Sequence, residues 1–156
     1  MEHFVAPYAL MVDDDEDDRS LFAETFAHAA PQAKLHQLSS GAALIQHLKK
    51  HPLPEMIFLD LNMPCMSGFE CLMHIRRDST LSNIPVIIYT TSMAYMDIEE
   101  AFHKGATFFL PKPSNLSCLA RAIQYLYSLN LRVHQTNKSD FVLTFPSRHK
   151  FHTSYL

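Results

Sequence analysis

The chain has 156 residues, of which 47% are hydrophobic and 19% charged, a composition typical of one globular domain and not of a disordered chain. Its net charge of −3 gives no general attraction to nucleic acid or to an anionic membrane surface. No apolar run reaches the roughly 20 residues that a membrane-spanning helix needs, and the N-terminus lacks the features of a signal peptide. The three cysteines have no CxxC spacing and indicate free thiols, so we expect a cytoplasmic protein with no membrane partner.

Strand-like apolar runs alternate with helical patterns along the first half of the chain. The expected elements are, in order, a strand at 8–12, a helix at 16–29, an edge strand at 33–38 and a helix opened by Ser39-Ser40-Gly41 that runs through His47. Pro31 ends the first helix. The edge strand is expected because its apolar residues alternate with a period of two, as in a strand with one solvated face.

The second half continues the same alternation. The expected elements are a strand at 56–60, a helix after Ser67-Gly68, a strand at 86–90, a helix at 95–104 ended by Gly105, a strand at 107–110 and a helix capped by Ser114 that runs to about residue 129. The strands at 56–60 and 86–90 are apolar almost throughout, which is typical of strands buried on both faces of a parallel sheet. Five strand–helix units in this length predict an α/β fold, a doubly wound parallel sheet with helices on both faces.

Polar side chains follow all five predicted strands. Ser39 and Ser40, after the second strand, are explained by a helix cap, and the other four strands carry a larger set. The residues at these strand ends are Asp13 and Asp14, Asp60, Thr90 and Thr91, and Lys112. Each alone has an ordinary explanation, such as a helix cap, a hydrogen-bonded strand end or a solvated charge. Because ligands of parallel α/β sheets bind outside the carboxyl ends of the strands, the whole set on one edge predicts a functional site there.

The residue types at this edge indicate a particular chemistry. Asp13, Asp14 and Asp60 supply hard oxygen ligands, which suit Mg²⁺, or Mn²⁺ in its place, and are too rich in oxygen for zinc. Lys112 can pair with a carboxylate at rest and with a phosphoryl oxygen afterwards. A carboxylate beside a divalent cation, a hydroxyl and an ammonium group is arranged to accept a phosphoryl group.

Six consecutive acidic residues, 13–18, open this site and divide into two groups. Asp13 and Asp14 stand at the strand end and are expected to face the cation. The residues from Asp15 to Asp18 fall at the cap and in the first turn of the next helix. Acidic side chains there gain a few tenths to about 1 kcal/mol each from the helix dipole. We expect these four side chains to face solvent.

Taken together, these motifs resemble the receiver domains of two-component response regulators. The segments that carry the resemblance are VDDDEDDR (12–19), IFLDLNMPCMSGFE (57–70), IPVIIYTTS (84–92) and GATFFLPKP (105–113). They occur in the family's order and spacing, cover about residues 8–129, and are most similar to stand-alone receivers of the phytochrome-associated type. The resemblance implies a flavodoxin-like receiver fold over residues 1–130, with the strand order 2-1-3-4-5.

The resemblance also implies the chemistry of the site. Asp60 would take a phosphoryl group from a phosphohistidine of a sensor histidine kinase or a histidine phosphotransfer protein. Asp13 and Asp14 would bind Mg²⁺ together with the Asp60 side chain and the backbone carbonyl of Asn62.

Further roles follow by matching position in the family pattern. Thr90 and Lys112 would hold the phosphoryl oxygens, and the peptide bond between Lys112 and Pro113 would be cis. Phe109 falls at the switch aromatic, which packs inward when the Thr90 hydroxyl moves toward the phosphate, although a purely structural core role is an alternative. Thr91 fills a place often taken by alanine or glycine and is expected to slow the access of phosphodonors and water.

The 26 residues after residue 130 are too few for a DNA-binding effector, so output is expected through protein contact and not direct nucleic acid binding. The expected contact face consists of the last two predicted helices and the strand between them. In this extension, 131–156, the segment 141–145 either adds a short strand beside the fifth strand, in its own chain or in a neighbour, or is flexible. A homodimer and a metal site formed by His149 and His152 are further alternatives.

Three rival functions remain open. A phosphorelay shuttle would use the same site. A degenerate receiver would serve only as an adaptor, but the complete set of polar residues argues against it. A phosphatase of the haloacid dehalogenase type would need a DxDx[T/V] motif after the first strand; Asp13 and Asp15 have the spacing, but Glu16 and Asp17 follow, and the nucleophile-like Asp60 stands on the third strand.

Overall fold

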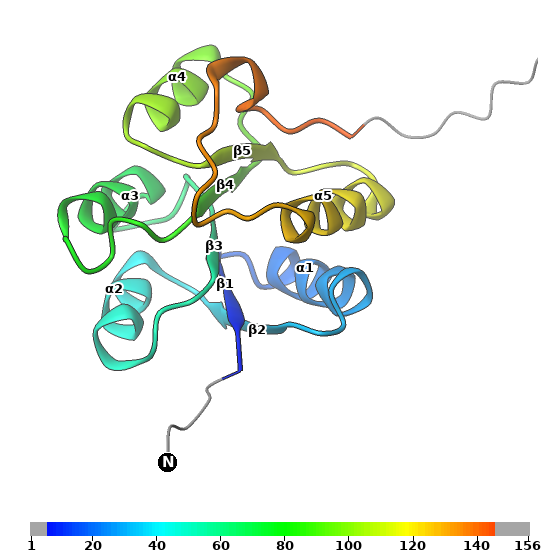
Figure 1. Cartoon of the computed structure of the whole chain (residues 1–156), viewed down its shortest axis with the longest axis horizontal. Helices are drawn as coiled ribbons and strands as arrows, with labels where there is room; N and C mark the ends of the chain where they lie inside the picture. Colours follow the sequence, from blue (N-terminus) through cyan, green and yellow to red (C-terminus); the bar gives the residue numbers. More distant parts are fainter. Residues whose placement is uncertain (1–5, 146–156) are drawn as a thin grey trace, which may run out of the picture.

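A five-stranded parallel sheet of order β2-β1-β3-β4-β5 forms the centre of the computed structural model, which describes residues 6–145 (Figure 1). The strands are β1 (Tyr8–Val12), β2 (Lys34–Leu38), β3 (Met56–Leu59), β4 (Val86–Thr90) and β5 (Phe108–Pro111). The helices are α1 (Glu16–Ala29), α2 (Gly41–Lys50), α3 (Gly68–Arg77), α4 (Tyr95–His103), α5 (Leu116–Ser128) and the 3₁₀ helix η1 (Lys138–Asp140). The predicted fold class and strand order are confirmed.

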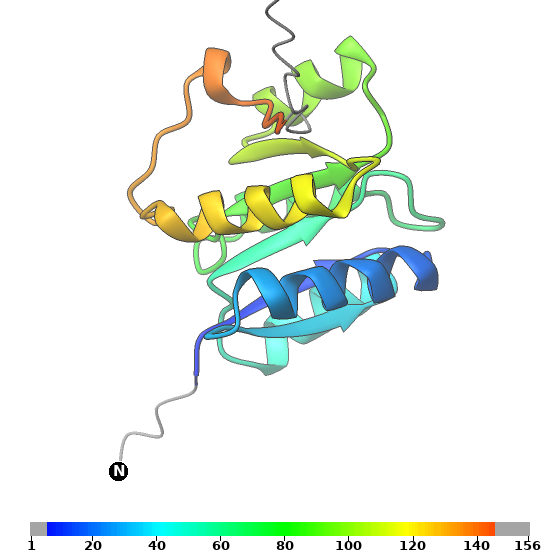
Figure 2. The same cartoon turned by 90° about the vertical axis from the view of Figure 1, so that its right-hand side faces the viewer.

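Helices cover both faces of the sheet, α1 and α5 on one face and α2, α3 and α4 on the other (Figures 1 and 2). Alternate residues of each inner strand therefore enter two separate cores. Leu10 and Ile57 pack under α2 and α3, whereas Ala9 and Phe58 pack under α1 and α5. This double cover explains why β1, β3 and β4 are buried along their whole length, while the edge strand β2 is not. Among the described residues, no helix is long and apolar enough to cross a bilayer.

Helix boundaries agree with the sequence patterns to within a residue except at the end of α2 and the start of α5. Helix α2 runs to Lys50, three residues beyond the expected His47, because the chain meets no helix-breaking residue before Pro52. Gly105 ends the α4 region with a positive φ of 87°, as expected for a glycine after a helix. The expected cap of α5, Ser114, is wrong: Asn115 is the N-cap, and its side-chain oxygen accepts a hydrogen bond of 2.7 Å from the backbone N–H of Ser117. Asn115 caps the helix because its amide oxygen reaches the first turn from the adjacent residue, whereas Ser114 stands one residue farther away.

The C-terminal segment, which we define as residues 131–145, returns from the end of α5 to the open edge of β5 (Figure 1). The backbone N–H of Phe109 donates to Phe141 O at 2.9 Å, and the N–H of Leu143 donates to Phe109 O at 2.8 Å. These bonds form a single parallel bridge between Phe109 and Val142 instead of a full sixth strand. Residues 141–143 are thus paired with β5 in their own chain. The proposed metal ligands His149 and His152 lie outside the described residues.

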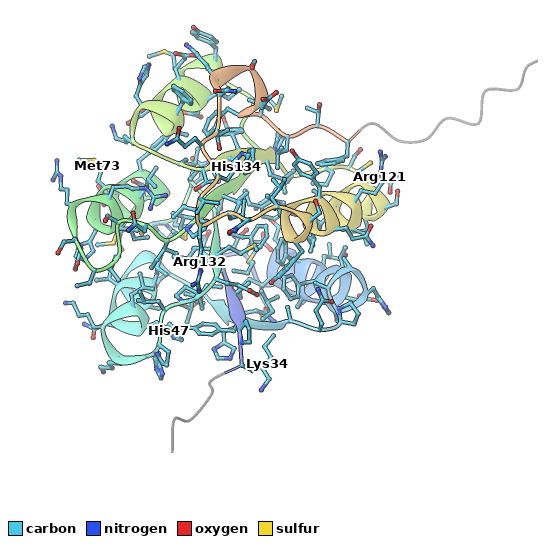
Figure 3. All side chains as sticks on the ribbon, viewed as in Figure 1. Lys34, His47, Met73, Arg121, Arg132 and His134 are labelled. Carbon is cyan, nitrogen blue, oxygen red and sulfur yellow. The ribbon has the colours of Figure 1, made fainter. Side chains whose placement is uncertain are left out.

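Side chains of the C-terminal segment also contact the helices on either side of β5. Lys138 forms an ion pair of 2.8 Å with Glu99 of α4. The ring centroid of Phe141 lies 5.2 Å from that of Phe102 in α4, and the ring centroid of Phe145 lies 5.8 Å from that of Tyr125 in α5. His134, labelled in Figure 3, contacts β5 itself, with its ring centroid 5.1 Å from that of Phe108. An unpaired strand edge is a template for pairing with another chain, and these contacts cover it.

Candidate functional site

Pairing of β1 with β3 brings two carboxylates together. Val12 lies opposite Leu59 in the parallel register, and the N–H of Asp60 donates to Val12 O at 3.0 Å. Each strand is followed directly by an aspartate, Asp13 or Asp60, so both side chains emerge at the same edge of the sheet. They are 0% and 6% exposed, which is unusual for carboxylates.

The carboxylates of Asp13, Asp14 and Asp60 each place an oxygen within 4.8 Å of the others. Negative charges at this separation repel one another, by about 4 kcal/mol per pair at the effective dielectric of a protein surface. Asp14 is exposed, so an ion can enter from solvent. The donor set consists of hard oxygens only, and it fits Mg²⁺ or Mn²⁺. Asn62, whose carbonyl is predicted to join this set, lies two residues beyond Asp60 in an exposed position.

A close backbone approach supports the loop after β3. The N–H of Gly68 donates to Leu61 O at 2.9 Å, which folds the loop back before α3 begins. A Cβ atom on Gly68 would stand 2.2 Å from the backbone oxygen of Asp60, so no larger residue fits without moving the loop. Gly68 therefore helps to fix the position of Asp60.

Burial and charge change the acidity of Asp60. Burial and the negative charge of Asp13 raise the pKa of Asp60 to about 6, against smaller opposing effects of Lys112, the Asn62 N–H and the Thr90 hydroxyl. Burial and the Asp13 charge thus destabilise the ionised form of Asp60, which is the nucleophilic one. A cation among the three carboxylates would remove that destabilisation.

Lys112 supplies the positive charge of the site. Its Nζ lies 2.6 Å from Asp13 Oδ2, 2.7 Å from Asp18 Oδ2 and 3.9 Å from Asp60 Oδ2. Burial alone would lower the pKa of Lys112, but the hydrogen bonds to Asp13 and Asp18 raise it overall, so the side chain is an ammonium ion. Its backbone N–H donates to Thr90 O at 2.7 Å, which ties the end of β5 to the end of β4.

The expectation that Asp18 faces solvent is wrong. Asp15 caps α1 by accepting a hydrogen bond of 3.0 Å from the N–H of Asp18. The first helical turn then directs the Asp18 side chain back toward Lys112, while Glu16 and Asp17 remain exposed. The sequence contains no signal that separates these acids, because only the rotation of the turn decides which one points inward.

The remaining predicted residues lie around the ends of β4 and β5. Thr90 is fully buried, and its hydroxyl contacts the Asp60 carboxylate and accepts a hydrogen bond of 3.3 Å from the Ser92 N–H. Thr91 is exposed next to it. Phe109 is fully buried, with its ring centroid 6.3 Å from that of Phe141.

The predicted cis peptide bond between Lys112 and Pro113 is wrong, because this bond is trans in the structure. The trans form before proline is favoured intrinsically by about 0.5–1 kcal/mol. In this form the chain leaves β5 and turns directly into the Asn115 cap of α5.

Comparison with known proteins identifies the family. Residues 9–124 match the family model described as the response regulator receiver domain. The chain belongs to the response regulator receiver family. This match confirms the predicted resemblance and covers every strand-end residue of the site.

Response regulator Rcp1 and a phytochrome response regulator are among the relatives. Response regulator Rcp1 of Synechocystis is 30% identical over 125 residues, which are 76% of this chain and 85% of Rcp1. The structure of its Mn²⁺-bound form superposes with a TM-score of 0.70 over 84% of this chain and 99% of that chain. The phosphorylated cyanobacterial phytochrome response regulator RcpA, 26% identical, superposes with a TM-score of 0.73 over 84% of this chain and 98% of that chain.

A regulator from a different organism gives a similar match. The probable methanogenesis regulatory protein FilR2 of Methanothrix harundinacea is 30% identical over 120 residues, 74% of this chain and 77% of FilR2. The family likeness therefore extends beyond phytochrome-associated regulators.

Proposed function

We propose that the chain is a phosphorylation switch in which Asp60 accepts a phosphoryl group from a phosphohistidine of a sensor histidine kinase or a histidine phosphotransfer protein. The observation that carries this proposal is the grouping of three carboxylate oxygens within 4.8 Å of one another, with the Lys112 ammonium 3.9 Å from Asp60. Such a group combines a nucleophile, ligands for a cation and a positive charge for phosphoryl oxygens.

The transfer is a simple exchange of bonds. A carboxylate oxygen of Asp60 attacks phosphorus, the P–N bond breaks, and the imidazole of the donor keeps the electron pair. The Thr90 hydroxyl and the Lys112 ammonium group each donate a hydrogen bond to the phosphoryl oxygens. The side chains of Asp13, Asp14 and Asp60 and the carbonyl of Asn62 would hold Mg²⁺ or Mn²⁺. When bound, this ion neutralises negative charge on the phosphoryl group. The Mn²⁺-bound form of Rcp1 supports this choice of ion.

We assign the response to phosphorylation to Thr90 and Phe109. When the Thr90 hydroxyl turns toward a new phosphoryl group, it leaves space near the end of β4, and the Phe109 ring packs inward toward that space. The burial of both side chains in the structure supports a packing response of this kind. Thr91, exposed beside them, narrows the approach to Asp60 and slows the exchange of the phosphoryl group.

Output passes to a protein target through the face of α4, β5 and α5. Large apolar side chains, which favour contact with another protein, stand at the start of α4: Met93 is 58% exposed, Tyr95 72% and Met96 80%. They follow Thr90 closely in the chain, so a change at the site reaches them through a short segment. The C-terminal segment occupies the β5 part of this face, and a second copy of the chain is one partner that could share it.

Phosphotransfer with matched controls tests the proposal. A histidine phosphotransfer protein carrying labelled phosphohistidine should transfer one phosphoryl group per chain to the wild type in Mg²⁺, and none to Asp60→Asn. A phosphorelay shuttle would in addition pass the label on to a second phosphotransfer protein. Steady release of phosphate from simple phosphate esters would favour the phosphatase alternative, and absence of label on the wild type would favour the adaptor.

A further inference from the structure

Lys112 has two carboxylate partners at hydrogen-bond distance, and only one of them belongs to the group of three carboxylates. Asp13 accepts at 2.6 Å and Asp18 at 2.7 Å, from opposite ends of the acidic run. We propose that Asp18 is a positioning residue for Lys112, which directs the ammonium group toward the phosphoryl group on Asp60. This role rests on the proposed function.

The count of donors explains how the positioning works. An ammonium group has three N–H donors on a flexible four-carbon stem. Asp13 and Asp18 take two of them, which fixes the direction of the third. At 3.9 Å, Asp60 Oδ2 is too distant for a hydrogen bond, but an oxygen of a phosphoryl group attached to Asp60 would extend into this gap. The ring of Tyr89, with its centroid 5.5 Å from Nζ, borders the ammonium group on another side.

Asp13 cannot fill this role alone. It belongs to the carboxylate group that fits a divalent cation, so its negative charge serves two positive partners. Asp18 lies outside that group. Among the described residues, Lys112 is the one side chain to which the Asp18 carboxylate is hydrogen-bonded. The charge of Asp18 would therefore hold Lys112 in place whether or not a cation is bound among the three carboxylates.

The first turn of α1 makes Asp18 a rigid partner. Its N–H is bonded to the cap residue Asp15 at 3.0 Å. The next residue, Arg19, donates from Nη1 to the backbone oxygen of Asp13 at 2.7 Å. The N–H of Asp15 in addition donates to Asp13 Oδ1 at 2.9 Å. The same turn thus anchors the backbone of both residues whose carboxylates hold Lys112.

The neighbouring Asp17 supplies a matched control. It lies in the same helical turn, carries the same charge and is exposed. Asp17→Asn therefore changes the net charge and the helix dipole interaction as Asp18→Asn does, but leaves Lys112 untouched. Any difference between the two variants reports on the contact with Lys112.

The test measures the rate of phosphorylation by acetyl phosphate at saturating Mg²⁺, together with Mg²⁺ affinity and the melting temperature. We expect Asp18→Asn to react about 3- to 10-fold more slowly than the wild type, the range for losing one partly exposed charged hydrogen bond. Asp17→Asn should stay within about twofold, and the two variants should have similar Mg²⁺ affinities and melting temperatures because neither residue is a predicted ligand. Asp18→Glu keeps the charge and should recover part of the rate.

Two results would refute the role of Asp18, and a third would refute the proposed function. Equal rates for Asp17→Asn and Asp18→Asn would show that only the general field of the acidic run matters and would refute the role of Asp18. A slow Asp18→Asn protein with weakened Mg²⁺ binding or a much lower melting temperature than Asp17→Asn would show a structural effect instead, also against the proposal. A wild type that gains no phosphoryl group would refute the proposed function itself.

Discussion

Replacement of Asp60 by asparagine should stabilise the protein at neutral pH when divalent ions are removed. The change keeps the shape of the side chain but removes a negative charge held beside Asp13 in a buried place. A pKa of about 6 against an ordinary value of 3.8 means that ionising Asp60 costs the folded state about 3 kcal/mol. We therefore expect Asp60→Asn to raise the free energy of unfolding by about 3 kcal/mol at pH 7.5.

The sign of the pH dependence follows from the raised pKa. Between the ordinary value of 3.8 and about 6, the folded state binds the Asp60 proton more tightly than the unfolded state does. Wild-type stability therefore falls as pH rises through this window, relative to the variant, and the difference between them shrinks to about 1 kcal/mol at pH 4.5.

Urea unfolding followed by circular dichroism, in chelator, measures this difference. With a slope of about 2 kcal/mol per molar urea, 3 kcal/mol moves the midpoint by about 1.5 M. Saturating Mg²⁺ should narrow the gap, because a ligand at 100 times its dissociation constant stabilises the wild type by about 2.7 kcal/mol. The reasoning would be refuted if the two proteins differed equally at pH 4.5 and 7.5, or if the wild type were the more stable one at pH 7.5 without divalent ions.

Three further predictions concern Thr91, the C-terminal segment and His47. Thr91→Ala should shorten the lifetime of the phosphoryl group by opening access to Asp60, and an unchanged rate of autodephosphorylation would contradict it. Phe141→Ala should lower the free energy of unfolding by about 3 kcal/mol because Phe141 is 1% exposed, whereas the control Val133→Ala, at a 74% exposed site, should change it by less than about 0.5 kcal/mol. Burial and the charges of His51 and His36 lower the pKa of His47 from 6.5, so the free energy of unfolding should fall as pH drops below that value. His47→Gln should reduce this fall, measured by urea unfolding at pH 5.5 and 7.5. An equal change of the free energy of unfolding with pH in both proteins would contradict the prediction.

The fold was predictable because local and global signals agree along this chain. The apolar runs at 8–12 and 86–90 match β1 and β4 residue for residue, since strands buried on both faces leave an uninterrupted apolar pattern. The strand ends were equally predictable, because a polar residue directly after such an apolar run lies at the edge of the sheet. Asp13 and Asp60 follow such runs, and their carboxylates do lie in one group.

The errors arose where geometry within a single turn decides the outcome. Asp18 shares its residue type and neighbourhood with Asp17, and only the helical rotation after the Asp15 cap sends one inward. Ser114 and Asn115 are both good caps, and one residue of register separates them. The contacts of the C-terminal segment depend on long-range packing against α4 and β5, for which a short segment such as 141–145 carries little pattern of its own.

The central claim is that Asp60 accepts a phosphoryl group in a site completed by a divalent ion. The most direct measurement is the mass of the intact protein after incubation with acetyl phosphate, with Mg²⁺ or with chelator, for the wild type and Asp60→Asn. The account predicts the addition of one phosphoryl group, only to the wild type and only with Mg²⁺. Addition to Asp60→Asn, or addition that is equally fast in chelator, would contradict it.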